Sequence, residues 1–517
     1  MNFGVNKIIQ QNKKIAKNSL ILYIRLIITT IIGILATRLV VRNLGISDYG
    51  LYSVVGSVVV MMNFLNTVMI TTTYRFIAYE IGRDDDRGVN KVFNISLIIH
   101  LAMIFVVLIL AETLGIWYIN NKLNIDPGKL YDAIFVFRLS VLATVINIIS
   151  IPFQGLITAR ENFRARASIE IIRSILRLAF VISLGFFLGN KLRIYAVMMT
   201  ILALVPSSLF IFYCKRVYSK LVTWNLQKDK EKYKEMIAFS GWTMIGAAAS
   251  VGKATGSQLV INAFFGTLLN AAFGIANRLN TFVMMFSRNL GQAAIPQIVK
   301  SHSSGNHDRT LMLVAYISKY TFLLMLIPSL PILLETEFLL KLWLGDIPEY
   351  TIAFSRLMII NGLIESLSSG TPAAIQATGK IKWFQIILST IMLLSLPIAY
   401  LLFKMGFPPF YIQVVYITSS ILNLFVSLIL MKKIINFNIM YLLKVSYFRI
   451  TLVTASILPF FWIVNLFEPS MFRLIITSVI TISWTLLMSY LIGFDIRERT
   501  KINSYLLNFF NKCKGHI

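Results

Sequence analysis

This chain of 517 residues is poor in charge, in acids and in cysteine, and each shortage excludes a class of protein. Charged residues make up 14% of the sequence, whereas a soluble globular protein carries about a quarter. Because 57% of the residues are hydrophobic and the mean hydropathy is +0.75, the composition excludes a soluble domain and indicates a membrane protein. The cysteines, Cys214 and Cys513, lie far apart on the side expected to be cytoplasmic, which argues against a structural disulfide.

The sequence also lacks the motifs of common catalytic and metal-binding sites. It has no Walker A phosphate loop, no recognisable Ser-His-Asp arrangement and no His, Cys, Asp and Glu cluster with metal-ligand spacing. We therefore expect a protein that is not an enzyme and that has no catalytic residue, metal or cofactor. The net charge of +27 could suit nucleic acid, but the bases gather in short loops between apolar runs, so we expect no nucleic-acid partner.

Apolar runs long enough to cross a bilayer fill the chain. At about 1.5 Å per residue, some 20 helical residues cross about 30 Å of hydrocarbon. The runs are continuous rather than alternating, which favours helices over a β-barrel. The predicted fold class is therefore an all-α polytopic membrane protein with about fourteen transmembrane helices. The expected spans are 19–41, 48–70, 92–116, 131–152, 168–189, 193–214, 236–262, 267–295, 311–334, 351–372, 382–403, 408–431, 450–467 and 472–494.

The distribution of Lys and Arg predicts the orientation of the chain. With the N terminus inside, cytoplasmic segments hold roughly 31 Lys and Arg and periplasmic segments roughly 8. The positive-inside rule therefore predicts that both termini are cytoplasmic. We expect no cleavable signal peptide, because the first 18 residues are polar and basic and the following apolar run is too long.

The two halves of the chain resemble each other at an offset of about 220 residues. Gly45–Tyr52 (GISDYGLY) corresponds to Gly266–Phe273 (GTLLNAAF), and Pro152–Arg160 (PFQGLITAR) corresponds to Pro372–Lys380 (PAAIQATGK). Such parallel repeats are found in transporters that bind substrate between two lobes. The expected domains are an N-lobe of six spans at 1–215, a Lys-rich cytoplasmic linker at 216–235, a C-lobe of six spans at 236–431, and a helix pair with a basic tail at 432–517.

Charges inside the apolar runs are nearly all positive. A charge in hydrocarbon costs about 3 kcal/mol unless it faces a cavity or a partner. With few acids to pair them, we expect several of these cations to line a wet, positive cavity that suits an anion such as a lipid phosphate. The candidate substrate-binding residues are Arg25, Arg138, Arg173, Arg177, Lys253 and Arg278, and further cations within apolar runs are Lys319 and Arg356.

The positions of these residues leave some alternatives open. Lys253 and Arg278 lie near the middle of their spans, too deep to reach the interface easily, whereas Arg173 and Arg177 lie close enough to an end for snorkelling to explain them equally well. Glu365 is the one acid that we place well inside a run, and it either couples ion movement or neutralises a nearby Arg. Candidate sugar contacts, which the sequence does not separate from packing residues, are Asn147, Gln154, Asn277, Asn361 and Gln376.

Small residues also form a run from Gly246 to Gly256 in the seventh span, including Gly252-x-x-x-Gly256. This spacing is typical of close helix packing. The alternative interpretation is a thin or bendable helix beside the cavity.

Three stretches resemble polysaccharide exporters of the Wzx type. Arg42–Ser53 (RNLGISDYGLYS) resembles their R-x-L-G-x-x-x-Y-G-L-Y stretch after the first span. Phe273–Arg278 (FGIANR) resembles their Y-G-I-A-x-R stretch, and Lys341–Gly345 (KLWLG) resembles their W-L-G element. The chain is thus similar, over nearly its whole length, to O-antigen flippases of the multidrug/oligosaccharidyl-lipid/polysaccharide (MOP) exporter superfamily, which includes the lipid II flippase MurJ.

The resemblance implies a flippase of the bacterial inner membrane. Its cargo would be an undecaprenyl-pyrophosphate-linked oligosaccharide, the repeat unit of O-antigen lipopolysaccharide, capsule or another surface polysaccharide, moved from the cytoplasmic to the periplasmic leaflet by alternating access. The resemblance also implies a cation in spans 1 and 8, which are Arg25 and Arg278 here. Expected partners are the lipid-linked oligosaccharide, the phospholipid bilayer and a polysaccharide polymerase or glycosyltransferase. The alternatives are a multidrug-type exporter of the same fold, which would need buried acids, and a membrane enzyme of the same pathway.

Overall fold

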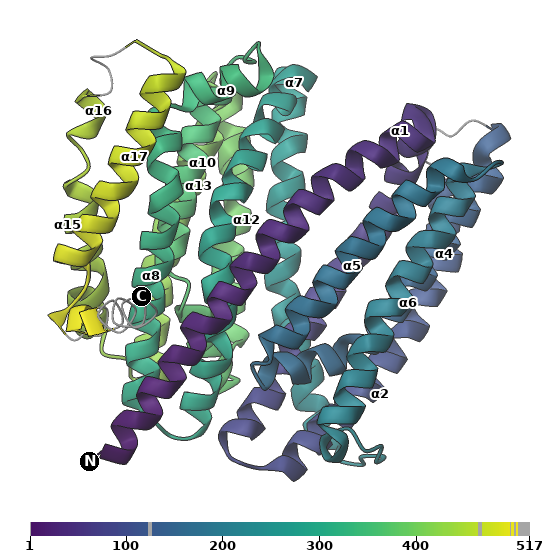
Figure 1. The fold of residues 1–517 in the computed structure, drawn as a ribbon, viewed down its shortest axis with the longest axis horizontal. Coiled ribbons are helices and arrows are strands. Elements are labelled where there is room, and N and C mark those ends of the chain that lie inside the picture. The colour runs from purple at the N-terminus through teal and green to yellow at the C-terminus, as the bar shows by residue number, and fades with distance from the viewer. Residues whose placement is uncertain (1, 122–126, 464–467, 497, 501–502, 505–517) are drawn as a thin grey trace, which may run out of the picture. The chain divides into compact units, whose positions relative to one another are not determined.

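The computed structural model describes residues 2–121, 127–463, 468–496, 498–500 and 503–504. Every regular element in these ranges is a helix, which confirms the predicted all-α class (Figure 1). The α-helices of the first half are α1 (Asn2–Gly82), α2 (Asp86–Leu110), α3 (Ile116–Asn121), α4 (Leu130–Ala159), α5 (Phe163–Ser183), α6 (Lys191–Val217) and α7 (Lys230–Ser303). Those that follow are α8 (His307–Leu334), α9 (Thr336–Leu344), α10 (Thr351–Leu367), α11 (Thr371–Thr378), α12 (Lys382–Lys404), α13 (Tyr411–Ile435), α14 (Ile439–Leu442), α15 (Phe448–Ala455), α16 (Phe460–Ile463) and α17 (Met471–Met488).

The chain divides into two compact units. Unit 1 consists of Met1–Ala248 and Val299–Gly305, and unit 2 consists of Ala249–Ile298 and Asn306–Ile517. Two of the three boundaries between the units fall inside α7, so this helix begins and ends in unit 1 while its middle part belongs to unit 2.

Two glycines break the longest helices at corresponding places. Gly45 has φ 79° and ψ 164° within α1, and Gly266 has φ 77° and ψ −172° within α7. This region of φ and ψ is essentially restricted to glycine, because a Cβ atom would clash with the backbone. The two glycines head the repeated stretches of the sequence, so their shared conformation supports the interpretation that the chain is duplicated.

Seven helices in the described ranges are long and apolar enough to cross a membrane. Only 22% of the most apolar windows of α12 and α17 is buried within the protein, so these helices present apolar surface that requires lipid around it. The chain is accordingly a multi-pass membrane protein, while the count of fourteen spans stays a prediction. The seven helices are Asp86–Asn121, Leu130–Ala159, Lys191–Val217, His307–Leu334, Lys382–Lys404, Tyr411–Ile435 and Met471–Gly493.

Two expected spans are interrupted. The span expected at 351–372 ends as α10 at Leu367, and α11 begins at Thr371 after a turn, with Pro372 in its first turn, where a missing N–H is harmless. In the span expected at 450–467, α15 ends at Ala455 shortly before Pro459, and residues 464–467 lie outside the described ranges.

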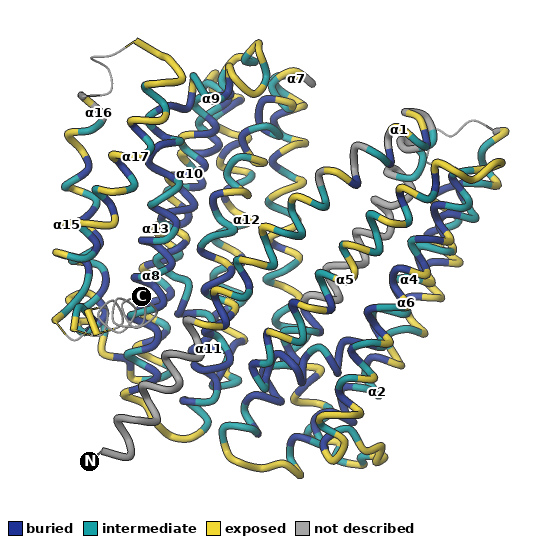
Figure 2. Tube along the Cα trace, viewed as in Figure 1, coloured by how far each residue is buried: buried dark blue, intermediate teal, exposed yellow. Residues whose placement is uncertain are grey.

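Buried residues are concentrated in α8, α10 and α13 of unit 2 (Figure 2). Among the seven apolar helices, α8 is the most enclosed, with 67% of its apolar window buried. The small-residue run of α7 packs on α12, because a Cβ atom added at Gly256 would lie 2.6 Å from Leu396 Cδ1. The contact favours the close-packing interpretation of that run.

Candidate functional site

A stripe of charged residues runs along one face of α5. Arg166, Glu170, Arg173 and Arg177 follow one another at intervals of four, three and four residues, which places them on the same side of a helix. Asn162 caps the start of α5 by accepting a hydrogen bond from Ala165 N at 3.3 Å. The helix carries more charge than a lipid-facing span tolerates, so the charged face must turn toward protein or water.

This stripe borders a polar cavity of about 280 Å³ within unit 1. Four helices, α1, α4, α5 and α6, supply its walls. The polar residues around it are Arg25, Thr29, Asn147, Gln154, Glu170, Arg173, Ser174 and Ser207. The structure thus brings together two of the predicted substrate-binding cations, Arg25 and Arg173, with two of the amides named as candidate sugar contacts.

Glu170 connects two arginines from different helices. Its Oε2 accepts a hydrogen bond from Arg25 Nη1 at 2.5 Å, and its Oε1 accepts one from Arg166 Nε at 3.0 Å. Arg166 is held in place by Thr158 on α4, since its Nη1 donates to Thr158 Oγ1 at 3.1 Å. The side chains of Arg25 and Glu170 are 13% and 29% exposed, so the pair is sheltered but open to the cavity.

Arg173 differs from Arg25 in having no such partner. Among the described residues, no acceptor lies within hydrogen-bonding distance of its guanidinium and no acid forms an ion pair with it, although it lines the cavity. Arg177 lies one turn further along α5, close enough to repel Arg173, and its Nε is buried without a hydrogen bond in the described structure. Two guanidinium groups, those of Arg25 and Arg173, therefore line the cavity with one carboxylate, that of Glu170, and the cavity is cationic.

Lys253 and Glu365 form a separate pair in unit 2. Lys253 Nζ lies 3.8 Å from Glu365 Oε1 and 4.2 Å from the centre of the Tyr416 ring. Glu365 Oε1 also accepts a hydrogen bond from Asn361 Nδ2 at 3.0 Å. Of the two roles considered for Glu365, this geometry favours neutralisation, with a lysine rather than an arginine as the base.

The remaining cations lie in different surroundings. Arg278 is an exposed residue of α7 in unit 2 without an ion pair among the described residues. Arg138 Nη2 donates to Glu112 Oε2 at 2.8 Å, with side chains 59% and 50% exposed. Lys319 Nζ donates to Glu498 Oε2 at 2.6 Å, and its side chain is fully buried. A cation in an apolar run therefore indicates a cavity in some cases and an internal ion pair in others.

Sequence reasoning missed Glu170 and Arg166. Arg166 lies just before the span expected at 168–189 and Glu170 lies near its start, and neither was named as a candidate. The signal was present, because Glu170 follows Arg166 by four residues and precedes Arg173 by three. The contact between Arg25 and Glu170, which are 145 positions apart, has no signal in the sequence.

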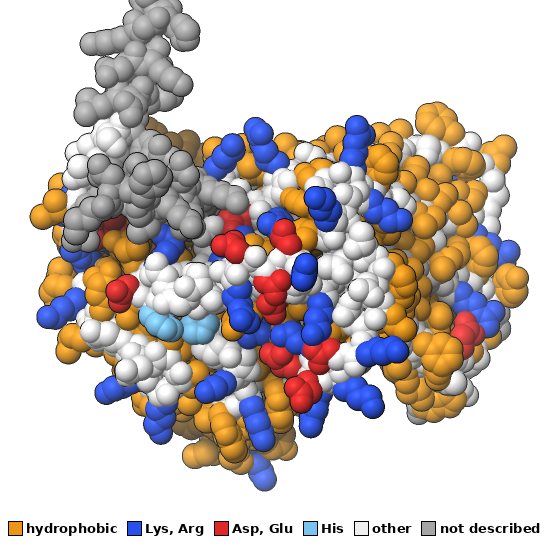
Figure 3. All heavy atoms as spheres, turned by 90° about the horizontal axis from the view of Figure 1, so that it is seen from below, with side chains coloured by type: hydrophobic (Ala, Val, Ile, Leu, Met, Phe, Trp, Pro, Cys, Tyr) orange, Lys and Arg blue, Asp and Glu red, His pale blue; other side chains and the backbone are white. Residues whose placement is uncertain are grey.

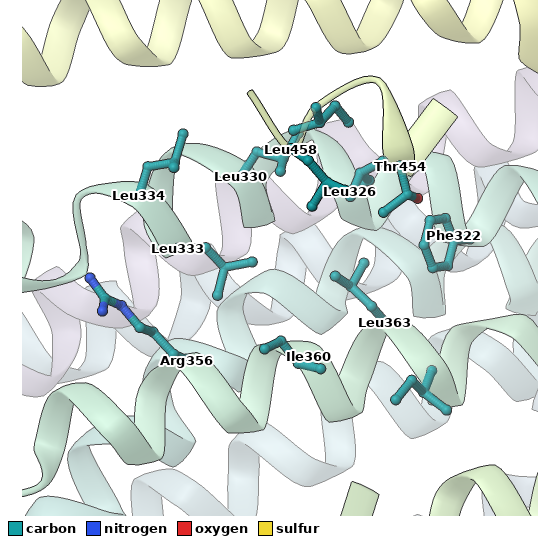
Figure 4. Close-up of a pocket in the computed structure, with 12 residues that line it drawn as sticks. Phe322, Leu326, Leu330, Leu333, Leu334, Arg356, Ile360, Leu363, Thr454 and Leu458 are labelled. Atoms are coloured by element: carbon teal, nitrogen blue, oxygen red, sulfur yellow. The ribbon is translucent and has the colours of Figure 1, made fainter. Parts of the chain in front are cut away.

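A second cavity, of about 520 Å³, lies within unit 2 and is mainly apolar (Figure 4). Leu and Ile side chains of α8 and α10 and of the segment around Thr454 surround it. Arg356 is at one end, where its Nε donates to Thr336 Oγ1 at 3.3 Å. The cavity has the size and lining that suit hydrocarbon.

Acidic and basic side chains lie side by side on the face shown in Figure 3. In unit 1, ion pairs connect helix ends, with Lys300 Nζ 2.5 Å from Glu161 Oε1 and Lys91 Nζ 2.6 Å from Asp229 Oδ2. The hydrogen bond from Lys91, aided by the backbone N–H of Lys232 that Asp229 caps, lowers the pKa of Asp229 below its usual value. No group of three or more His, Cys, Asp and Glu in the described ranges is placed to hold a metal ion.

Comparison with solved structures shows the fold of MATE transporters of the MOP superfamily. The chain is similar to a MATE protein crystallised in the bent conformation, with a TM-score of 0.72 and 15% identity over 82% of this chain and 96% of that one. It is similar to an outward-facing multidrug resistance MATE transporter of the MOP superfamily, with a TM-score of 0.70 and 19% identity over 82% and 96%. A MOP transporter from Pyrococcus furiosus, described as having a binding pocket of reverse polarity that suggests a different function, gives 0.69 and 15% over 81% and 95%. No family model and no curated protein matches the chain.

Proposed function

We propose that this chain is a transporter of the bacterial inner membrane that flips an anionic lipid-linked oligosaccharide of the undecaprenyl-pyrophosphate class. The observation that carries the proposal is the cationic cavity of unit 1, in which Arg25 and Arg173 line a polar space. Transport is supported by the fold, which the chain shares with MATE transporters, and by its apolar helices.

The chemistry of the cavity suits a phosphorylated sugar. A guanidinium group binds phosphate oxygens through parallel N–H donors, and arginine keeps its charge in a sheltered site. Asn147, Gln154 and Ser207 add amide and hydroxyl groups that can pair with sugar hydroxyls. A cavity of about 280 Å³ accommodates a phosphate with part of a glycan, and the rest of a longer headgroup would extend beyond it.

The apolar cavity of unit 2 supports the lipid part of the proposal. Its lining of Leu, Ile and Phe side chains excludes a sugar but suits an isoprenoid chain. We propose that this cavity takes up hydrocarbon of a lipid, and Arg356 lies at one end of it (Figure 4).

A second candidate function is export of cationic drugs, because one of the similar structures is described as a multidrug resistance transporter. Binding a drug cation would require an unpaired acid in the cavity. Glu170 already bridges Arg25 and Arg166, and the surplus of guanidinium groups repels a further cation. The polarity of the cavity therefore favours an anionic cargo.

The proposal is tested by transport in proteoliposomes, with a fluorescent undecaprenyl-pyrophosphate oligosaccharide and a cationic dye as alternative cargoes. We expect Arg25→Ala to reduce flipping by about 30-fold, because losing a charge-assisted contact of about 2 kcal/mol weakens binding by that factor. Arg138→Ala is the matched control, since Arg138 belongs to unit 1 but is paired with Glu112 away from the cavity. Export of the dye without flipping of the lipid, or equal effects of the two substitutions, would refute the proposal.

A further inference from the structure

The carboxylate of Glu170 is placed as a bound anion would be. Its two oxygens accept hydrogen bonds from two guanidinium groups on different helices, Arg25 of α1 at 2.5 Å and Arg166 of α5 at 3.0 Å. A phosphate group bridges arginines through the same kind of N–H···O contacts. In the described structure, the chain thus fills one part of its cationic cavity with its own acid.

The neighbouring Arg173 lines the same cavity but is not paired with an acid among the described residues. It lies three residues beyond Glu170 on α5. An incoming anion can therefore meet Arg173 first, without displacing any group. To reach Arg25 as well, it has to take the position of the Glu170 carboxylate.

We propose that Glu170 is a resident counter-ion, which occupies the anion subsite of the empty transporter and is displaced from Arg25 by a phosphate group of the cargo. This inference rests on the proposed function, since it requires an anionic cargo. It assigns a specific subsite, formed by Arg25 and Arg173, and a specific competitor within the chain.

The structure also provides a place for the displaced carboxylate. Arg166 lies one turn before Glu170 on α5 and donates a hydrogen bond to Thr158 as well. It can therefore keep its hydrogen bond to Glu170 when the contact between Glu170 and Arg25 is broken. The carboxylate then remains paired and next to the subsite. Because it continues to compete for Arg25, the cargo is held less tightly than two free arginines would hold it, which helps its release on the far side.

A similar arrangement occurs in unit 2. Lys253 lies 3.8 Å from Glu365, and that carboxylate is also held by a second group of its own unit, Asn361, at 3.0 Å. Each unit therefore contains a cation within a span that is paired with an acid, and in each case a second side chain also donates a hydrogen bond to that acid. The recurrence supports a functional rather than an accidental pairing of Arg25 with Glu170.

The test is binding of inorganic pyrophosphate to the purified full-length chain, measured by isothermal titration calorimetry. We expect Glu170→Gln to bind pyrophosphate about tenfold more tightly than the wild type, because the competing and repelling charge is gone. Glu112→Gln is the matched control, since it removes a carboxylate from another arginine of unit 1 and should leave the affinity unchanged. Glu170→Ala, which removes the same carboxylate in a different way, is expected to change the affinity in the same direction if the glutamine variant does not fold.

Different outcomes separate this inference from the function on which it rests. If Arg25→Ala loses pyrophosphate binding but both Glu170 variants bind it as the wild type does or more weakly, the counter-ion role is overturned and the anionic site stands. If Arg25→Ala binds pyrophosphate as well as the wild type, the cationic cavity is not the binding site, and the proposed function and the counter-ion role both fail. Tightening by Glu112→Gln equal to that by Glu170→Gln would show a general effect of net charge and would overturn the specific role of Glu170.

Discussion

Lys319 and Glu498 give a direct test of how this protein tolerates charge in its interior. Their side chains are 0% and 7% exposed, and Lys319 Nζ donates to Glu498 Oε2 at 2.6 Å. The rings of Tyr316, Tyr320 and Phe494 surround the ammonium group, with centres 5.1, 5.5 and 6.0 Å away. The pair joins α8 to the segment that follows the last span, so its loss should loosen the attachment of the C-terminal segment.

We expect either single substitution, Lys319→Met or Glu498→Gln, to destabilise the protein by about 3–5 kcal/mol, because each leaves one buried charge without its partner. The double variant should lie closer to the wild type than either single variant, since no buried charge without a counter-charge remains. The measurement is the free energy of unfolding of the purified protein in detergent. A double-mutant cycle then gives the coupling energy between the two side chains.

The matched control is the exposed pair Arg138 and Glu112, with side chains 59% and 50% exposed. Here Arg138→Met and Glu112→Gln should each change stability by less than about 1 kcal/mol, because water screens the charges. The reasoning would be refuted if the two substitutions at the buried pair were additive, or if they destabilised the protein no more than those at the exposed pair.

Three further predictions concern backbone, packing and pH. Gly266→Ala should lower the unfolding free energy by about 1–3 kcal/mol because φ is 77° there, whereas Gly274→Ala, in open space on the same helix, should be neutral or stabilising. Gly155→Ala should cost about 1–3 kcal/mol, since its Cβ would lie 2.7 Å from Thr73 Cγ2, and a thermal unfolding midpoint equal to that of wild type would contradict it. Asp229→Asn should lower the unfolding midpoint by a constant amount from about pH 8 to about pH 5 and by less below about pH 4. The lowered pKa of Asp229 means that its stabilisation is fully present above the ordinary carboxyl pKa and is lost as pH falls through the folded-state value; an unchanging difference at low pH would refute this.

The parts of the fold that depend on composition and local pattern could be predicted from the sequence. Hydropathy is a sum over neighbouring residues, so continuous apolar runs predicted helices and a membrane class that the structure confirms. The paired positions of Gly45 and Gly266 were visible as a repeat, although their left-handed φ values were not. The interruption of the span expected at 351–372 has a local signal too, since Gly370 and Pro372 are adjacent to the turn.

The candidate site could be predicted only in part, because it depends on which charges meet across the fold. Arg25 and Lys319 look alike in the sequence, as single bases within apolar runs. Arg25 borders a cavity and shares Glu170 with Arg166, whereas Lys319 is enclosed with an acid 179 positions away. Neither partner can be found from spacing, because loop lengths and helix packing decide the contact rather than sequence separation.

This difference also limits what the excess of bases can indicate. A base and an acid that pair only with each other, as in Lys319–Glu498 and Arg138–Glu112, add no net charge around a cargo, however deep they lie. The charge available to a cargo is that of the bases in excess of acids around one space, and in unit 1 that excess is located on α5 beside Arg25. Attraction of an anion therefore depends on a small group of arginines rather than on the formal charge of +27. It follows that neutralising Arg173 should weaken anion binding more than removing any lysine from the loops, although each change subtracts one unit of charge.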